Sequence, residues 1–461
     1  MGQFPHRLLW LGLIFLAVGC SEPVIRPQSP SLSFDSFDEL KRQVSRLRGL
    51  SFRDEVLLEI RSAAEIHSLL EKLSPNEEKK ARLGDLARVY GRLGALPEDT
   101  DLVRASTDLR LFKRAVHYDH RTKIVSMPGE PIRPSLALST ALGLPETLAR
   151  EILLTQALTH ALQEQSFDWG AKIREQTSED VVLARKAVST GDAVLLGLAR
   201  LLGDAKENQE KLLQALNGLA RSGGYLETEL PHVPEFLRRK AAFPYTWGSQ
   251  FVLWAYTLKG WEGVNSLFSR PPVSTEQILH PSKYYVKRDD PLAIIPWSLI
   301  NRYRNQTISD ETLGEFLIES LLRRTVSSDE AKRAAAGWAG DRLLAFENQA
   351  QFFLAWVTAW DNKEEALEFY GSYRTSLEKS LSVSMKPARG NADVLVATLE
   401  DKRSLLLQKK DEFVFFLDGL PSSQALQVAE GLWRQLETGK DISVPKLSLD
   451  QARSRRLRTP K

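Results

Sequence analysis

The chain has 461 residues, enough for about three domains of average size. Hydrophobic residues make up 43% and charged residues 26%, which excludes a largely disordered chain, a collagen-like chain and a polytopic membrane protein. The formal net charge of +3 predicts no overall basic surface for nucleic acid. The single cysteine, Cys20, excludes an intrachain disulfide and a cysteine-rich zinc module.

The first residues have the pattern of a secretory leader. The basic side chain of Arg7 precedes an uncharged run from Leu8 to Val18. At about 1.5 Å per residue this run is too short to cross a hydrocarbon core of about 30 Å, but it fits the apolar core of a signal peptide. It ends in Ala17-Val18-Gly19-Cys20, which resembles the lipobox of bacterial lipoproteins. The resemblance implies cleavage before Cys20 and a lipid anchor on that cysteine. The alternative is a plain secretory signal that ends in cysteine.

The segments next to the leader and at the other end of the chain carry no apolar periodicity. Residues 20–33 contain three prolines and several serines, which predicts a solvated tether after a leader of residues 1–19. Ser21 follows Cys20 where an aspartate would favour the inner membrane. The lipoprotein resemblance therefore implies a location in the outer membrane, facing the periplasm or the cell surface. Residues 441–461 form a basic tail that is expected to be disordered.

Between these ends the hydrophobic spacing predicts a mainly α fold of the α+β class. No internal repeat and no Pro/Gly-rich linker divides it, so residues 34–385 are predicted to form one helical domain, and residues 386–440 a small strand-plus-helix cap. Helices are expected at 34–50, 63–73, 76–93, 145–165, 179–202, 251–258, 311–323, 346–360 and 422–436. Strands are expected at 56–60, in a hairpin at 116–126, and at 394–399, 404–409 and 412–417.

The segment from Leu153 to Trp169 carries the strongest functional signal. Its run Leu-Thr-His160-Ala-Leu-Gln-Glu-Gln-Ser-Phe-Asp resembles the zinc-binding helix of bacterial HExxH metallopeptidase-like proteins of the gluzincin type, whose local pattern is HELTHALQDQ-x-FD. In an HExxH helix two histidines four residues apart lie on one face and bind zinc. The glutamate after the first histidine acts as the general base on the zinc-bound water.

Further blocks fit the same proteins in the same order, so the resemblance extends over residues 47–369. Residues 187–193 are similar to the ALVEGDA helix of that family, whose glutamate supplies the third zinc ligand. Residues 245–284, 335–342 and 356–361 match later blocks. The resemblance implies a zincin-like helical peptidase fold.

The metal centre is where this chain departs from the family. Gln156 stands at the first histidine, Ala157 at the general base and Thr190 at the third ligand, so His160 alone remains. Because a catalytic zinc site needs three protein ligands, we expect no metal, no cofactor and no peptidase activity. A contact between Gln156 and His160 is expected in place of the metal. Asp192 lies about 200° around the helix from Thr190, so it is not expected to replace the lost ligand.

These departures favour a non-enzymatic envelope lipoprotein. Such a protein would bind a peptide or protein partner in the former peptidase cleft, with Tyr245 and Asp192 as candidate cleft residues, or serve as a scaffold. The alternative is a metal-independent hydrolase that uses His160 with an acidic partner. A third hypothesis is a regulator that pairs with an active paralogue.

Three other features receive structural interpretations. Residues Ser274–Gln277 fit a capping box at the start of a helix. His280, before Pro281, is expected to hold a turn. Residues Gly337–Arg342 are interpreted as a tight turn in which Asp341 and Arg342 pair with each other.

Overall fold

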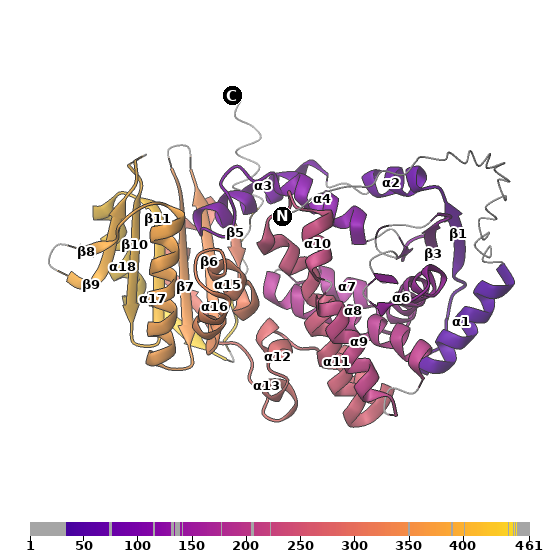
Figure 1. The fold of residues 1–461 in the computed structure, drawn as a ribbon. Coiled ribbons are helices and arrows are strands. Elements are labelled where there is room, and N and C mark those ends of the chain that lie inside the picture. The colour runs from indigo at the N-terminus through magenta and orange to yellow at the C-terminus, as the bar shows by residue number, and fades with distance from the viewer. Residues whose placement is uncertain are drawn as a thin grey trace, which may run out of the picture.

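The computed structural model describes residues 34–450 with short gaps, and Figure 1 shows a mainly helical part beside a part built on a large sheet. The gaps are residues 73–75, 114–115, 131–132, 134–138, 141, 177, 204–206, 222, 349–350, 389–390, 401, 441, 446, 448 and 450. The predicted leader, the lipidation site Cys20, the tether and residues 451–461 of the tail lie outside the described residues. Over the part described, no helix is both long enough and apolar enough to cross a membrane.

The first segment forms a small sheet edged by helices, largely as the sequence predicts. Strand β3 lies in the centre, parallel to β1 and antiparallel to β2. The predicted hairpin is confirmed, with Lys123 in the left-handed region at φ 58° where the chain turns. The elements are α1 (Phe34–Arg48), β1 (Leu57–Arg61), α2 (Ala63–Lys72), α3 (Glu77–Arg92), α4 (Leu102–Lys113), β2 (His117–Asp119) and β3 (Ile124–Pro128).

Three long helices form the centre of the helical part: α6 (Glu146–Phe167), α8 (Glu179–Leu202) and α11 (Glu235–Ser269). The N-terminus of α8 is capped by Ser178, whose side chain accepts from the backbone N–H of Val181. Helix α11 contains a kink at Lys259 and Gly260, and Gly260 has a positive φ of 61°. Shorter helices complete this part: α7 (Trp169–Arg174), α9 (Gln209–Arg221), α10 (Gly223–Glu229), α12 (Thr275–Leu279) and α13 (Ser282–Tyr285).

Helices α8 and α11 cross with their backbones in close contact. A Cβ atom on Gly191 would lie 2.3 Å from the carbonyl oxygen of Gly248, and a Cβ atom on Gly248 would lie 2.4 Å from the carbonyl oxygen of Ala187. Small residues therefore set the distance between the two helices, because any side chain at the crossing would meet main chain.

A seven-stranded sheet, antiparallel at every pairing, organises the C-terminal part, in the order β5-β6-β7-β11-β10-β9-β8. Helix α17 packs on one face, where Tyr373 contacts Trp356 and Phe416, and α18 packs on the other, where Trp433 contacts Phe415. A separate pair, β4 and β12, adds two short strands. The strands are β4 (Ala293–Pro296), β5 (Thr307–Glu311), β6 (Trp338–Glu347), β7 (Phe352–Trp360), β8 (Lys386–Ala388), β9 (Asn391–Thr398), β10 (Ser404–Lys410), β11 (Phe413–Leu420) and β12 (Leu436–Gly439). The helices are α14 (Trp297–Tyr303), η1 (Arg304–Gln306), α15 (Gly314–Leu322), α16 (Ser328–Ala335), α17 (Lys363–Ser380) and α18 (Ser422–Arg434).

The α+β class is confirmed, but the prediction of a helix at residues 346–360 is wrong. Phe346 and Glu347 end β6, and Phe352–Trp360 form β7. Strand β7 is covered on both faces, so it reads as an unbroken apolar run, and periodicity cannot distinguish such a strand from a buried helix. The three later strands and the helix after them lie where the sequence predicts. Because β11 pairs with β7, their sheet runs across the boundary predicted between residues 385 and 386.

Candidate functional site

Helix α6 carries the segment that resembles the HExxH helix, and it packs against α8. Gln156 lies beside Gly197 of α8, while Gln163, two turns further along α6, donates to the carbonyl of Ser189 at 2.9 Å. The two helices are therefore antiparallel. Ala157 is buried, and Gln156 and His160 are half-buried. Gln156 and His160 thus lie one turn apart on α6, the spacing of the two histidines in an HExxH helix.

A buried ion pair lies next to these positions. The guanidinium of Arg48, at the end of α1, donates from Nε to Asp192 Oδ1 at 2.9 Å, and neither side chain has any exposed surface. Arg48 also donates to Asn265 of α11 at 2.8 Å and stacks over Trp261. Gln163 donates to Asp192 Oδ2 at 2.9 Å. Asp192 therefore lies in the interior, in a network that joins α1, α6, α8 and α11, rather than on an accessible wall.

The other predicted site residues lie on α6, α8 and α11, three of the helices that this network joins. His160 Nδ1 is 3.0 Å from Gln163 Oε1, so the polar partner seen for this histidine is an amide three residues on, where the sequence predicts Gln156. Thr190 is half-buried on α8, two residues before Asp192 and directly before the close crossing at Gly191. Tyr245 is half-buried on α11, and its carbonyl accepts from Ser249 at 2.6 Å.

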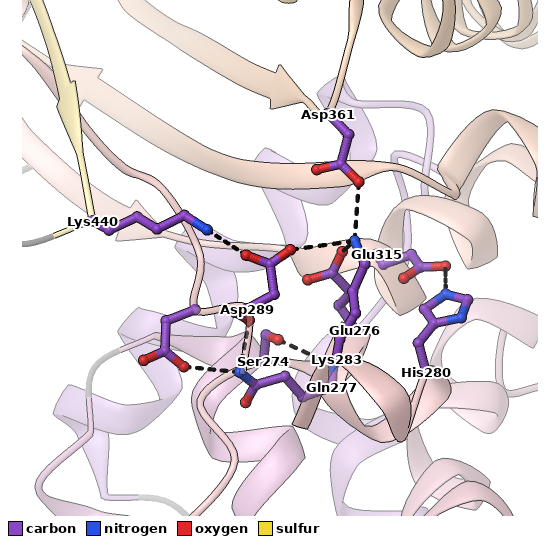
Figure 2. A network of polar contacts seen from close by, with 10 residues as sticks. Ser274, Glu276, Gln277, His280, Lys283, Asp289, Glu315, Asp361 and Lys440 are labelled. Carbon is purple, nitrogen blue, oxygen red and sulfur yellow. Dashed lines mark hydrogen bonds and ion pairs between the residues drawn. The ribbon is translucent and has the colours of Figure 1, made fainter. Parts of the chain in front are cut away.

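A second polar cluster lies between the helical part and the sheet (Figure 2). Its centre is Lys283 of α13, whose ammonium lies 2.5 Å from Glu276, 3.0 Å from Asp361 and 3.7 Å from Asp289. Lys440 pairs with Asp289 from the far end of the chain. Burial lowers the pKa of Lys283, but the hydrogen bonds and charges of Glu276 and Asp361 outweigh burial and raise it, so Lys283 stays a cation beside these two acidic side chains.

A histidine–carboxylate pair adjoins the lysine. His280 Nε2 is 2.9 Å from Glu315 Oε1 of α15. This hydrogen bond raises the pKa of His280, while burial raises the pKa of Glu315. Half of the predicted capping box is present, since the Ser274 hydroxyl accepts from the N–H of Gln277 at 3.2 Å, whereas the Gln277 side chain accepts from the N–H of Val273 rather than that of Ser274. His280 follows α12 as its C-cap, consistent with the expected turn.

The interpretation of Gly337–Arg342 as a tight turn with Asp341 paired to Arg342 is wrong, because the residues from Trp338 onward form strand β6. The carboxylate of Asp341 accepts from the indole N–H groups of Trp338 and Trp356 and from the N–H groups of Leu313 and Gly314, at 2.9–3.0 Å. Arg342 instead makes a two-pronged ion pair with Asp310, at 2.8 and 2.9 Å. The reason is that neighbouring residues on strand β6 point to opposite faces of the sheet.

The Lys283 cluster as a whole could not be predicted from the sequence, because its members come from four separate segments. One local signal was present. Glu276, His280 and Lys283 follow one another at intervals of four and three residues, the spacing of a single helical face. Asp289, Asp361 and Lys440 could be added only once the fold was known.

The titration of Glu276 gives a testable prediction. Burial raises the pKa of Glu276 from 4.5 to about 7, against the opposing effect of Lys283. Between these values the folded chain holds a proton that the unfolded chain has released, so stability falls as pH rises. The proton on Glu276 accounts for a fall of up to about 3 kcal/mol in the free energy of unfolding over this pH range. We expect Glu276→Gln to abolish this part of the fall. Urea unfolding at several pH values between 4.5 and 7 measures the free energy of unfolding of both proteins. Glu430→Gln, on the exposed face of α18, serves as control, and an unchanged slope for Glu276→Gln would contradict the assignment.

Comparison with known proteins covers only part of the chain. Residues 301–430 match the family described as a domain of unknown function (DUF8575), which takes in the strands from β5 to β11 and most of α18. No curated protein and no solved structure matches the chain. Within the described ranges, no group of three histidine, cysteine, aspartate or glutamate side chains is arranged to hold a metal ion.

Proposed function

We propose that this chain is a catalytically inactive relative of the HExxH peptidases, with a zincin-like helical part, and that it serves the bacterial envelope as a binding or scaffold protein. One observation carries the proposal. The antiparallel helices α6 and α8 bear an amide at Gln156, a methyl at Ala157 and a hydroxyl at Thr190, at the positions where the family has two zinc ligands and a base. None of these three groups can act as a general base, and none is a strong ligand for zinc.

The network around Asp192 supports a structural role for the former site. Its guanidinium, carboxylate and two amides join four helices without exposing the ion pair to water. A buried pair of this kind holds its elements in a fixed arrangement, because separating the partners leaves a charge unpaired in the interior. A retained framework with altered chemistry at its centre is what a binding or scaffold protein derived from a peptidase requires.

The alternative of a metal-independent hydrolase built on His160 has less support. A histidine base is normally oriented by a carboxylate, and the contact described above for His160 Nδ1 is with the amide oxygen of Gln163 at 3.0 Å. Histidine–carboxylate pairs occur elsewhere, at His280 with Glu315 and at His232 with Asp108.

Zinc content tests the loss of catalysis. We expect the purified chain, saturated with zinc and then dialysed, to retain far less than one equivalent by elemental analysis, because one of three ligands cannot hold the ion. Casein cleavage should be no faster with the protein than without it, before or after treatment with a chelator. One tightly held equivalent of zinc, or cleavage abolished by His160→Ala, would contradict the proposal.

We propose further that Cys20 carries lipid and holds the protein in the outer membrane. Two or more acyl chains anchor a protein stably, whereas one chain anchors it only marginally. We expect the wild-type chain to sediment with outer membranes and Cys20→Ser to appear in the soluble periplasmic fraction. Ser21→Ala is the matched control and should stay with the membrane. A Cys20→Ser variant that still sediments with membranes would show that the anchor lies elsewhere.

A further inference from the structure

A pocket of about 490 Å³ opens at the start of α11, far in sequence from the degenerate motif. Three segments form it: the turn after α3, which contains Pro97; the link into α11, which contains Pro231 and His232; and the end of α15. Arg238 on the first turns of α11 and the neighbouring residues Arg323 and Arg324 line it as well. Its volume falls in the range of pockets that hold small molecules.

Two of the three arginines are fixed by main chain rather than by carboxylates. Arg238 donates from Nη1 to the carbonyl of Val233 at 2.7 Å, and Arg324 donates from Nη1 to the carbonyl of Gly94 at 2.5 Å. No carboxylate of the described residues forms an ion pair with either guanidinium, while Arg323 pairs with Glu319 at 2.8 Å. The acidic member of the lining is Glu235, an exposed residue. The lining therefore keeps a positive charge.

The geometry of these guanidiniums suits an anion. Main-chain carbonyls orient an arginine without neutralising it, and a guanidinium has five N–H donors in a planar fork. Because each of these two arginines uses Nη1 for its main-chain hydrogen bond, its Nε and Nη2 can donate hydrogen bonds to a ligand. Burial lowers the pKa of Arg324, which means that its charge is partly removed from water. A carboxylate or phosphate placed against a partly desolvated guanidinium stabilises its charge and accepts its hydrogen bonds.

The remaining lining residues indicate what the rest of the ligand would contact. Pro97, Pro231 and Pro234 contribute apolar rings to the lining, and Phe236 adds an aromatic ring. His232 is held at the rim by Asp108, with 2.7 Å between Nε2 and Oδ2, and keeps 46% of its side chain exposed. Charged and apolar side chains thus line the same small volume.

We propose that this pocket binds a small organic anion, with its carboxylate or phosphate group between Arg238 and Arg324 and its apolar body against the prolines. This inference goes beyond the proposed function, since it concerns a different part of the fold and does not depend on the fate of the zinc site.

Calorimetric titration of the purified full chain tests the proposal with three probes. Phenyl phosphate and benzoate carry the two kinds of anionic group, and benzyl alcohol is their neutral counterpart. We expect at least one anion to bind the wild type more tightly than about 10 mM, benzyl alcohol not to bind measurably, and the tighter anion to identify the preferred group. High salt should weaken the binding.

Substitutions of the two arginines test whether the anion binds in this pocket. Arg324→Gln and Arg238→Gln should each weaken it by about tenfold or more, since each removes one charged fork. Arg434→Gln, which removes an exposed arginine on α18, should bind as the wild type does. Thermal unfolding shows which variants fold, and Arg324→Gln decides the matter if Arg238→Gln does not fold. Absence of anion binding, equal binding of benzyl alcohol, or unchanged affinity in Arg324→Gln would overturn the proposal.

Discussion

Replacing Asp192 by alanine is expected to destabilise the protein by about 3–5 kcal/mol. The variant leaves the guanidinium of Arg48 without its carboxylate in a place with no exposed surface. It also removes an acceptor of Gln163, whose amide would lose the bond to Oδ2. Both losses fall on the same network, so the effect should be among the largest that a single substitution can produce in this chain.

Urea unfolding monitored by tryptophan fluorescence measures this loss. Glu430→Ala, which removes an exposed ion pair on α18, is the control and should change stability by less than about 1 kcal/mol. The double variant Arg48→Met with Asp192→Leu should recover much of the loss, because it removes both buried charges together. A loss below about 1 kcal/mol for Asp192→Ala would mean that the pair is not buried as described.

Replacing Gly248 by alanine should have a similarly large effect, because the new methyl group would lie 2.4 Å from the carbonyl oxygen of Ala187. That atom belongs to main chain, so α8 and α11 must move apart to relieve the contact. The expected loss is about 3 kcal/mol, at the upper end of the range for overpacked cores. A shift of this crossing would also move Thr190 and Asp192, which lie next to Gly191 on α8.

Gly371→Ala provides a matched control for the crossing. Gly371 lies in α17 with nothing within 4 Å of a Cβ atom built on it. Alanine there should stabilise the protein by about 0.5–1 kcal/mol, as expected for an exposed helical glycine. Thermal unfolding of both variants distinguishes a steric clash at the crossing from the general effect of replacing a helical glycine by alanine. If Gly248→Ala were as stable as Gly371→Ala, the close crossing of α8 and α11 would not exist.

The sequence was most informative where residues at the ends of an element mark its limits. Helix α8 begins and ends as predicted, because Ser178 caps it and Gly203 follows it. Strand β7 could not be distinguished from a helix, since a strand that is buried on both faces shows no alternation of apolar and polar residues. The helix expected at residues 311–323 begins only at Gly314, because the residues before it pair with β6 as part of β5.

The candidate site could be predicted only in part, for a different reason. Motif spacing places Gln156 and His160 one turn apart on the same helix, and the structure agrees. The ion pair of Arg48 with Asp192 joins residues 144 positions apart, and nothing in the local sequence of either residue indicates the other. Long-range polar partners depend on how the elements pack, which a single sequence does not reveal.

Restoring the missing ligands tests the central claim most directly. The claim is that a zinc centre was lost while the helices that held it kept their places. We therefore compare the wild type with the double variant Gln156→His, Thr190→Glu by zinc titration and elemental analysis. With His160, the variant has the three ligands that a zinc site needs. The account predicts about one zinc per chain for the variant and none for the wild type. One tightly bound zinc in the wild type, or a folded variant that binds none, would contradict it.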